Sequence, residues 1–290
     1  MFEQLGLVGC GLMGGSFALA LKRAGLVKRV IGYSKSPTTT SKALKMGVID
    51  AEAPSALMAV SGADLVLISV PVAATEAIFK TIIHIVSPKA LVMDVGSTKQ
   101  DVVKAARTVL KDKMGLFVPC HPIAGKELSG VEHADANLYK DKKIILTPTE
   151  RTQTAQLKRA TDLWTALGCD VHTMSPAAHD AAYAVVSHLP HMLGFALMNS
   201  ILAQDDSKEY LSLAGSGFRD FTRIAASEPK MWTDIMLANK EELIAQSKAF
   251  RRSLQAMEVL IQQGEHDALL ELVTKASKAR AHWRMNDKKN

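Results

Sequence analysis

The first sixteen residues, MFEQLGLVGCGLMGGS (1–16), decide the fold of this chain. Apolar residues predict a short buried strand that ends just before Gly9, and the apolar run 16–24 predicts a helix. Gly9, Gly11 and Gly14 lie between them with the spacing G-x-G-x-x-G. A strand, a glycine turn of this spacing and a helix are together typical of a dinucleotide-binding site.

Each glycine of this turn has its own physical role. Gly9 permits the tight turn, Gly11 has no side chain to hold a pyrophosphate away, and Gly14 lets the helix lie close to the strand. The free N–H groups and the dipole at the start of the helix then face the phosphates. We expect the cofactor to contact Gly9, Gly11, Leu12, Met13 and Gly14. The alternative is an ordinary glycine-rich turn between a strand and a helix.

The second predicted strand, 29–33, bears on which nicotinamide cofactor binds. A site that prefers NAD usually has Asp or Glu at the end of this strand, where the carboxylate holds the ribose 2′-hydroxyl. Here Ser34 takes that position, Lys35 and Ser36 follow, and the next carboxylate is Asp50. A hydroxyl and an ammonium group suit a 2′-phosphate, so the sequence favours NADP, with NAD as the alternative if Lys35 is merely solvated.

Strands and helices are expected to alternate up to residue 173. Further strands are predicted at 64–70, 91–95, 116–119, 144–147 and 170–173, and further helices at 38–46, 74–86, 102–110 and 152–167. This alternation predicts an α/β fold with a doubly wound parallel sheet of the Rossmann type. Ligands of such sheets bind beyond the carboxyl ends of the strands, where we expect Val70, Pro71, Ser97 and His121.

The rest of the chain is predicted to be all helical, which divides the protein into domains 1–173 and 174–290. An apolar period of 3.6 residues predicts one long helix over 231–263. The stretch 181–204 contains no Asp, Glu, Lys or Arg and is long enough to span a bilayer. Because it also contains histidines, an asparagine and Pro190, which should break it, we expect a buried helix pair in a subunit or domain core rather than a membrane span.

His121 is the candidate proton acceptor. It is followed by Pro-Ile-Ala-Gly, so we expect a histidine aimed by a tight loop, with a surface histidine as the alternative. A histidine near a nicotinamide is suited to take an alcohol proton as hydride leaves, because its pKa lies near the working pH. Ser97 could bond the imidazole or the same hydroxyl, or could cap the helix that starts near Lys99. Cys120 is expected to be a small buried residue rather than a nucleophile.

The helical half carries a second group of candidates. Ser187 and His191 are four residues apart and share a helix face, with His188 as a competing choice. One of the two histidines is expected to be a packed core residue. Arg219 and Arg223 also share a face, and either could bind a substrate carboxylate with two hydrogen bonds. The alternative for these arginines is an ion pair with the neighbouring aspartate.

Composition limits the class of protein. Of the 290 residues 48% are hydrophobic, which is ample for sizeable cores. A net charge of +6 suits a small anionic ligand, while the scattered basic residues do not indicate nucleic acid. Three cysteines without a C-x-x-C pair predict reduced thiols in a cytoplasm, and no signal peptide is visible. The nine histidines show no metal-ligand spacing, so no metal is expected.

Several motifs, in this order, resemble those of the prephenate and arogenate dehydrogenases of tyrosine biosynthesis. They are GLVGCGLMGGS, VMDVGSTK, HPIAGKELSGVE, VVSHLPHMLGFAL and GSGFRDFTRIAASEPKMW, between Gly9 and about Gly264. Such a set is far more specific than the glycine spacing alone. The resemblance implies nicotinamide-linked oxidative decarboxylation of a cyclohexadienyl acid to a 4-hydroxyphenyl product. It also implies a helical dimerisation domain. The apolar surface of 181–204 and of the 231–263 helix is more than about 115 residues can easily bury alone, so we also expect a homodimer formed through the helical domains.

The resemblance also implies roles for individual residues. In that family the histidine that corresponds to His121 accepts the proton of the substrate hydroxyl, and the serine that corresponds to Ser97 assists it. The residues implied to line the substrate pocket are Arg223, Ser187, His191 and, at its entrance, Glu127. An acidic residue at this last position is associated with prephenate, and Lys126 beside it adds positive charge, so we expect prephenate to be preferred over arogenate.

Two other functions stay open from the residues alone. A 2- or 3-hydroxy-acid dehydrogenase would be expected to use a catalytic lysine or an arginine–histidine pair, and it would leave the HPIAG motif unexplained. A non-catalytic module that senses NADPH would need no proton acceptor. Loss of activity on substitution of His121 by Asn would separate these functions.

Overall fold

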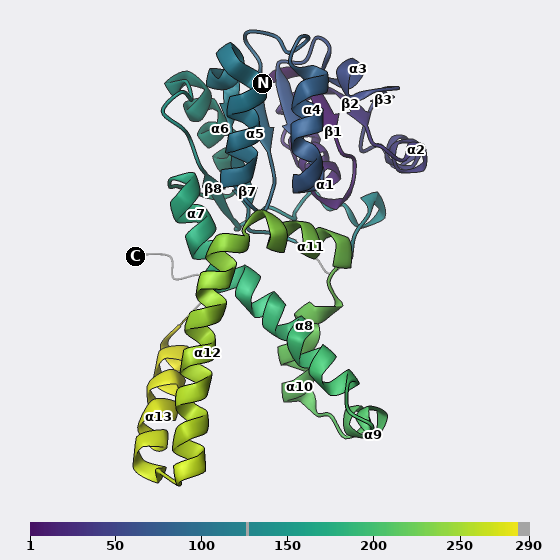
Figure 1. Ribbon diagram of the computed structural model, residues 1–290. Coiled ribbons are helices and arrows are strands. Elements are labelled where there is room, and N and C mark those ends of the chain that lie inside the picture. Colours follow the sequence, from purple (N-terminus) through teal and green to yellow (C-terminus); the bar gives the residue numbers. More distant parts are fainter. Residues whose placement is uncertain (126–127, 284–290) are drawn as a thin grey trace. The chain divides into compact units, whose positions relative to one another are not determined.

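The computed structural model describes residues 1–125 and 128–283. Internal packing divides the chain into two compact units, residues 1–243 and 244–290 (Figure 1). The larger unit contains both sheets and the helices up to α11. Each unit is described by itself below.

A parallel six-stranded sheet forms the centre of the larger unit, with the strand order β3-β2-β1-β4-β5-β6. The order changes direction between β1 and β4, where the chain crosses from one half of the sheet to the other. This is the doubly wound arrangement that the alternation predicts, so the expected fold class is confirmed. The strands are β1 (Phe2–Val8), β2 (Val27–Tyr33), β3 (Ala51–Glu52), β4 (Leu65–Ile68), β5 (Leu91–Asp94) and β6 (Phe117–Val118).

Helices cover both faces of this sheet and give it two cores. Successive residues of β1 point to opposite faces. Leu7 therefore joins a cluster with Phe17 and Trp164, while Val8 joins a cluster with Phe79 on the other face. The helices are α1 (Leu12–Arg23), α2 (Pro37–Lys45), α3 (Ala56–Val60), α4 (Thr75–Ile82), α5 (Gln100–Leu110) and α6 (Thr154–Ala166). Burial on both faces explains why these strands read as continuous apolar runs.

A second, three-stranded sheet departs from the prediction of a single parallel sheet. It has the order β7-β8-β9, with β7 (Cys120–Pro122) antiparallel to β8 (Lys143–Leu146) and β8 parallel to β9 (Asp170–Thr173). The change of sheet follows Pro119, which has no N–H to continue the pairing of β6 with β5. The carbonyl of Pro119 instead accepts from the N–H of Thr147 at 2.9 Å. The prediction that His121 lies in a loop is thus wrong, because it is the central residue of β7.

The helical part of the larger unit begins with one continuous helix, not a pair broken at Pro190. It consists of α7 (Pro176–Tyr183), a π-helical turn η4 (Ala184–His188) and α8 (Leu189–Leu202). Pro190 lies inside this continuous helix, directly after the π turn, which locally changes the hydrogen-bond pattern beside the position where the proline has no N–H. After it come α9 (Ser207–Ser212), α10 (Ser216–Thr222), the 3₁₀ turn η5 (Arg223–Ala226) and α11 (Pro229–Ala238).

This helix, Pro176–Leu202, is long and apolar enough to cross a membrane by length and composition alone. The expectation that its apolar run is buried within the chain is wrong for the described residues. Only 17% of its most apolar window is covered inside the structure. The uncovered part, which includes Val185, Val186 and Leu202, is apolar surface that needs another partner.

The predicted long helix over 231–263 is also wrong, because it is interrupted at Asn239. This residue has φ −108° and ψ 33°, outside the helical region, and separates α11 from α12 (Lys240–Gln263). Its side-chain Nδ2 donates to the carbonyl of Asp180 at 2.8 Å and contacts Nδ1 of His188 at 3.1 Å. The break therefore coincides with a buried polar contact to α7 and the π turn.

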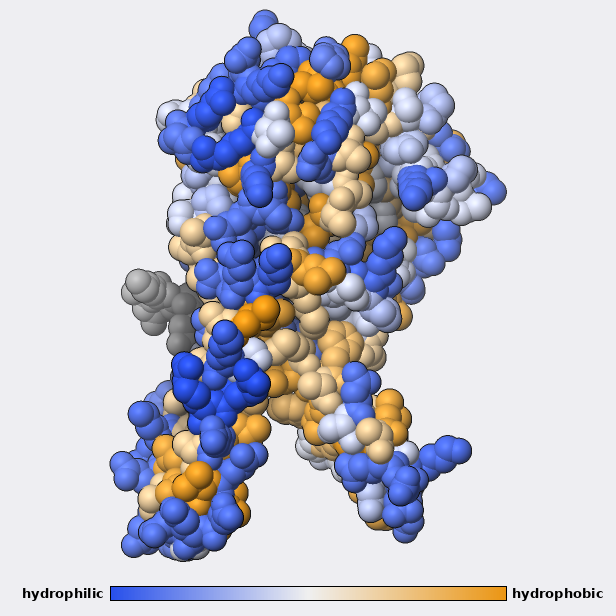
Figure 2. Space-filling model, viewed as in Figure 1, coloured by the Kyte–Doolittle hydropathy of each residue, from blue (hydrophilic) through white to orange (hydrophobic). Residues whose placement is uncertain are grey.

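The smaller unit contains most of α12 and all of α13 (His266–His282), which follow one another at Gly264. Apolar side chains gather among charged ones on its surface (Figure 2). Those at a helical spacing on α12, which we call the apolar stripe, are all exposed: Phe250, Leu254, Met257 and Ile261. An exposed stripe of this kind is typical of a surface that is covered by another chain.

We predict that Gly14→Ala destabilises the fold, whereas Gly217→Ala does not. A Cβ on Gly14 would overlap the Gly9 carbonyl oxygen and lie 2.9 Å from Leu7 Cδ1, while a Cβ on the helical, exposed Gly217 meets nothing within 4 Å. Urea denaturation should show a loss of about 1–3 kcal/mol for the first variant and no loss, or a slight gain, for the second. Equal stabilities would contradict this account of how α1 packs on β1.

Candidate functional site

The glycine turn forms a cradle at the carboxyl end of β1. Gly9 has φ +100°, and a Cβ there would overlap the carbonyl of Ser69 after β4, so the turn requires glycine. Gly11 faces open space, since a Cβ added there meets nothing within 4 Å. The N–H groups of Leu12 and Met13 lie in the first turn of α1, which no side chain caps. An uncapped helix start beside open space fits a pyrophosphate group.

The turn after β2 lies against this cradle. Ser34 Oγ accepts from the N–H of Cys10 at 2.8 Å, and the Ser34 side chain also forms a hydrogen bond with the Cys10 thiol. Lys35 and Ser36 are exposed at the start of α2. Asp50, the next carboxylate along the chain, is bonded to Lys22 and to the N–H of Val30, so it does not serve this turn.

Val70 and Pro71 complete the rim of the cradle. They follow Ser69 directly after β4, and Pro71 precedes the 3₁₀ turn η1 (Val72–Ala74). This turn packs against α11 of the helical part. The predicted cofactor residues of the three strand ends are therefore gathered at one edge of the sheet, where the helical part begins.

A buried ion pair fixes the strand that carries His121. Lys99 and Asp94 are both fully buried and paired with each other. Lys99 Nζ also donates to the carbonyl of Cys120 at 2.8 Å, and Asp94 Oδ1 accepts from the N–H of Cys120 at 3.0 Å. The two side chains thus hold both backbone groups of the residue before His121. Burial raises the pKa of the Cys120 thiol, which agrees with a packing residue rather than a nucleophile.

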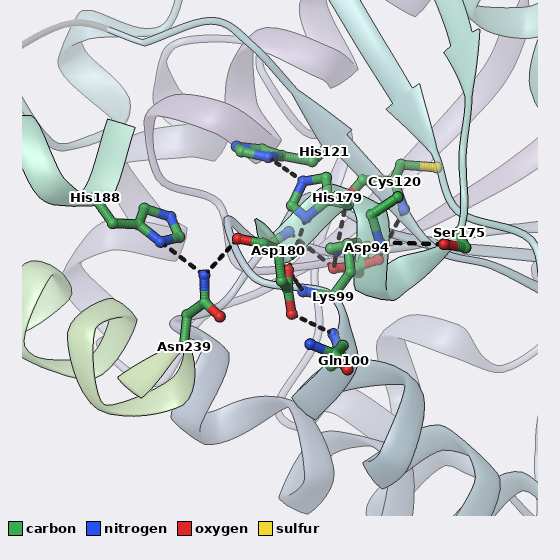
Figure 3. Close-up of polar contacts among 12 residues, drawn as sticks. Asp94, Lys99, Gln100, Cys120, His121, Ser175, His179, Asp180, His188 and Asn239 are labelled. Carbon is green, nitrogen blue, oxygen red and sulfur yellow. Dashed lines mark hydrogen bonds and ion pairs between the residues drawn. The ribbon is translucent and has the colours of Figure 1, made fainter. Parts of the chain in front are cut away.

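His121 is linked to a second histidine and a carboxylate on α7. Its Nδ1 lies 2.8 Å from Nε2 of His179, and Nδ1 of His179 lies 2.7 Å from Oδ1 of Asp180 (Figure 3). Asp180 accepts two further bonds of 2.8 Å, from the backbone N–H groups of Lys99 and Gln100. We call the three side chains of His121, His179 and Asp180 the relay.

The hydrogen bonds of the relay determine which ring nitrogens carry protons. Burial alone would raise the pKa of Asp180, but bonds from His179 and from two backbone N–H groups hold that pKa below its usual value, so it is a carboxylate that only accepts. His179 Nδ1 must then carry a proton. Burial lowers the pKa of both histidines, which are neutral at pH 7. His121 therefore donates from Nδ1 and keeps an unprotonated Nε2.

A second set of side chains surrounds the π turn. His191 stacks on Trp232, with ring centroids 3.5 Å apart and planes 18° apart, and its Nδ1 lies 2.9 Å from the carbonyl of Ser187. Burial lowers the pKa of His191, and the charge of Arg223 lowers it further. Arg223 begins η5, which packs against α8. The structure thus brings His191, Ser187 and Arg223 together.

The remaining residues predicted for the substrate site lie in different environments. Arg219 forms an exposed ion pair with Asp220 at 3.4 Å, which is the alternative foreseen for it. His188 is the packed histidine of the pair, buried against Asn239, and next to the backbone of Ser97. Lys126 and Glu127 lie outside the described residues.

Sequence reasoning missed the partners of His121. Nothing local distinguishes His179 and Asp180 except their place just after Ser175, whose hydroxyl accepts from the N–H of Ala178 and starts α7. Trp232 was likewise missed, although it lies in a motif noted for its arginines. Within residues 1–125 and 128–283 the histidines, cysteines and carboxylates form no cluster of three that could hold a metal ion.

Comparison with known proteins places the chain among prephenate dehydrogenases. The family model "Prephenate dehydrogenase, nucleotide-binding domain" matches residues 17–173, and "Prephenate dehydrogenase, dimerization domain" matches residues 175–275. The resemblance seen in the motifs is confirmed.

Individual relatives and a solved structure agree. The chain is 35% identical over 271 residues to the prephenate dehydrogenase of Bacillus subtilis, which covers 93% of this chain and 73% of the relative. It is 32% identical to the cyclohexadienyl dehydrogenase of Zymomonas mobilis, with 97% and 96% covered. A crystal structure of the A. aeolicus prephenate dehydrogenase with hydroxyphenyl propionate and NAD⁺ matches with a TM-score of 0.91 and 39% identity, covering 97% of this chain and 98% of that one.

We predict that His188 makes the fold sensitive to acid. Burial lowers its pKa from 6.5 to about 4, so between these values the unfolded chain binds a proton that the folded chain does not. Its contribution is complete above pH 6.5 and is lost as the pH falls towards 4. Between pH 7 and pH 5 the protein should lose about 2 kcal/mol more stability than the His188→Asn variant, whose amide oxygen can still accept from Asn239.

The measurement is the free energy of unfolding by urea at several pH values. His84→Asn, at an exposed histidine, serves as the control and should follow the unmodified protein. The same pH dependence in His188→Asn and in the unmodified protein would show that His188 is not held neutral in the fold.

Proposed function

Because the chain belongs to the prephenate dehydrogenase family, and is thus a prephenate or cyclohexadienyl dehydrogenase of tyrosine biosynthesis, we propose the following roles for its residues. His121 is the proton acceptor, and Ser97 assists it. Arg223, His191 and Ser187 bind the substrate. The single observation that carries this proposal is the relay, which leaves Nε2 of His121 unprotonated as a proton acceptor requires.

The reaction follows from the position of this proton acceptor. When bound, the nicotinamide accepts a hydride from the carbinol carbon of the substrate. His121 Nε2 takes the hydroxyl proton as the carbonyl forms. Loss of carbon dioxide from the quaternary carbon then makes the ring aromatic and leaves a phenolate oxygen, to which the proton taken up at His121 can return to give the 4-hydroxyphenyl product. The neutral state of His121, favoured by burial and by the nearby Lys99 charge, keeps the acceptor available at pH 7.

The substrate is held at its carboxylate by Arg223, because a guanidinium binds a carboxylate with two parallel hydrogen bonds. Its proximity to His191 supports this choice over Arg219, whose side chain is exposed to solvent. Prephenate and arogenate share that carboxylate and differ at the side chain. We propose prephenate as the preferred substrate, since it carries more negative charge and the chain has a net charge of +6.

The cofactor we propose is NADP. Ser34 is a half-buried hydroxyl at the end of β2, and Lys35 is exposed beside it, a combination that suits a 2′-phosphate. The alternative is NAD, the cofactor bound in the A. aeolicus structure. Glu52 of β3 is near enough for its charge to act on Cys10, and it is the carboxylate that could then hold a ribose hydroxyl. Binding of NADP requires an uncharged residue at position 34, whereas binding of NAD is compatible with a carboxylate there.

The assembly we propose is a homodimer formed through the helical domain, 174–290. Two features support it: the uncovered apolar surface of the helix Pro176–Leu202 and the apolar stripe on α12. A second copy of the chain would cover both.

Three free thiols, two of them buried, agree with the reducing cytoplasm that we propose as the compartment.

The first test of these roles is His121→Asn. Loss of the proton acceptor should lower kcat by about 10²–10⁴, and by the same factor with prephenate and arogenate, because the side chain takes no part in the chemistry. Cofactor binding should be unchanged. Initial rates with both substrates, together with fluorescence titration of NADPH, measure this. Full turnover in the variant would rule out the role of His121.

The second test concerns the cofactor. The unmodified protein should have a higher kcat/KM with NADP than with NAD, and Ser34→Asp should reverse the preference, because a carboxylate repels the 2′-phosphate and accepts from the 2′-hydroxyl. Glu52→Gln should leave the use of NADP unchanged. If the unmodified protein uses NAD equally well or better, the interpretation of Ser34 and Lys35 as a binding site for the 2′-phosphate is wrong.

The third test concerns assembly. Sedimentation at micromolar concentration should give twice the chain mass of 31.3 kDa. Leu254→Glu, within the apolar stripe, should shift the protein towards the monomer, while Gln255→Glu, at the neighbouring exposed position, should not. A stable monomer in the unmodified protein would refute the proposed dimer.

A further inference from the structure

The relay contains a second histidine that could accept the proton from His121, which a single proton acceptor does not need. This inference rests on the proposed role of His121. Once its Nε2 has taken the substrate proton, both ring nitrogens carry hydrogen and the ring is a cation. Its Nδ1 proton then points at the lone pair on Nε2 of His179, 2.8 Å away. Nothing separates the two imidazoles, so a proton can pass between them along an existing hydrogen bond.

We propose that His179 is a positioning residue that fixes the tautomer of His121 and then takes the positive charge from it during the hydride-transfer step. The substrate O–H bond breaks and an N–H bond forms at His121 Nε2. The N–H bond at His121 Nδ1 breaks and one forms at His179 Nε2. The proton on His179 Nδ1 stays in its bond to Asp180 Oδ1. One proton enters the relay, and the two electrons leave as hydride to the bound nicotinamide.

The charges around the two rings favour this transfer. Burial, His179, Lys99 and His188 all lower the pKa of His121, and no carboxylate among residues 1–125 and 128–283 is among the causes that shift it. Burial and Lys99 also lower the pKa of His179, but Asp180 and Asp94 raise it. The cation is therefore better placed on His179 than on His121.

The neighbouring groups do not compete for the proton. Tyr183 lies against both rings, at centroid distances of 4.9 and 4.5 Å, and burial raises its pKa to about 12, so it stays neutral. Burial also raises the pKa of the Cys120 thiol. His179 is thus the neighbouring group that can accept the proton from His121.

The end of the relay is rigid and keeps its charge. The oxygens of Asp180 accept from two backbone N–H groups at the start of α5, where the helix dipole favours a negative charge. The Asp180 carbonyl accepts from Asn239 Nδ2 at 2.8 Å. A carboxylate held in this way does not take the proton itself, so the charge stops at His179 and is paired there. Because α7 carries both His179 and Asp180, the helical part of the larger unit supplies two of the three side chains of the relay.

The test is a proton inventory of single-turnover hydride transfer, measured as the appearance of NADPH in mixtures of light and heavy water. Two protons in motion should give a curved dependence on the deuterium fraction. His179→Gln should make it linear and lower the rate by about 10–100-fold, part of the 10²–10⁴ expected for a general base, with KM for prephenate unchanged. The glutamine oxygen can still accept from His121 Nδ1, so a merely orienting role of His179 would leave the rate of this variant unchanged and would give a linear inventory in the unmodified protein.

His172→Gln is the matched control. His172 and Asp170 form an exposed pair of the same length, 2.7 Å, and the variant should keep the rate and the curved inventory. A linear dependence on the deuterium fraction in the unmodified protein overturns the proposal. This measurement does not depend on whether any variant folds. If His121→Asn is inactive while His179→Gln is fully active, the relay fails and the role of His121 stands. If His121→Asn is active, the proposed role of His121 itself fails.

Discussion

The buried ion pair between Lys99 and Asp94 is the contact on which the rest of the site depends. Neither side chain is accessible to solvent beyond 2%, and removing one partner of such a pair leaves an uncompensated buried charge, at a cost of about 3–5 kcal/mol. The pair connects β5, the start of α5 and β7, because Lys99 and Asp94 also bind the backbone of Cys120. His121 is held through this frame and not through its own loop.

The helix α7 supplies the polar groups that complete the site around His121. The glycine turn and the ends of β2 and β4 form the proposed cofactor cradle without any help from α7. His121 gains its second histidine and carboxylate only when α7 lies against α5, with Asp180 bonded to the N–H groups of Lys99 and Gln100. The π turn that follows leaves His188 packed inward and Ser187 beside His191. The proposal therefore places nucleotide binding on the sheet and its glycine turn, and proton transfer on a site that needs α7 as well.

The fold class was predictable because its signals are local. The glycine spacing, the apolar runs and the change to helical periodicity after residue 173 each extend over a few residues. The errors have long-range causes: Pro119 moves His121 into a second sheet, and the side chain of Asn239 bonds to α7 and η4 where one helix was expected. His179 is 58 residues from His121 along the chain, so no local pattern could pair them.

The central claim of this account is that His121 presents an unprotonated Nε2 because its Nδ1 donates to His179. The ring ¹⁵N chemical shifts of the histidines at pH 7 test it most directly, with the His121 signals assigned by their loss in His121→Asn. We predict a pyrrole-type shift for Nδ1 and a pyridine-type shift for Nε2 of His121 in the protein without substrate. The opposite pattern, with the proton on Nε2, or two protonated nitrogens, would contradict the account.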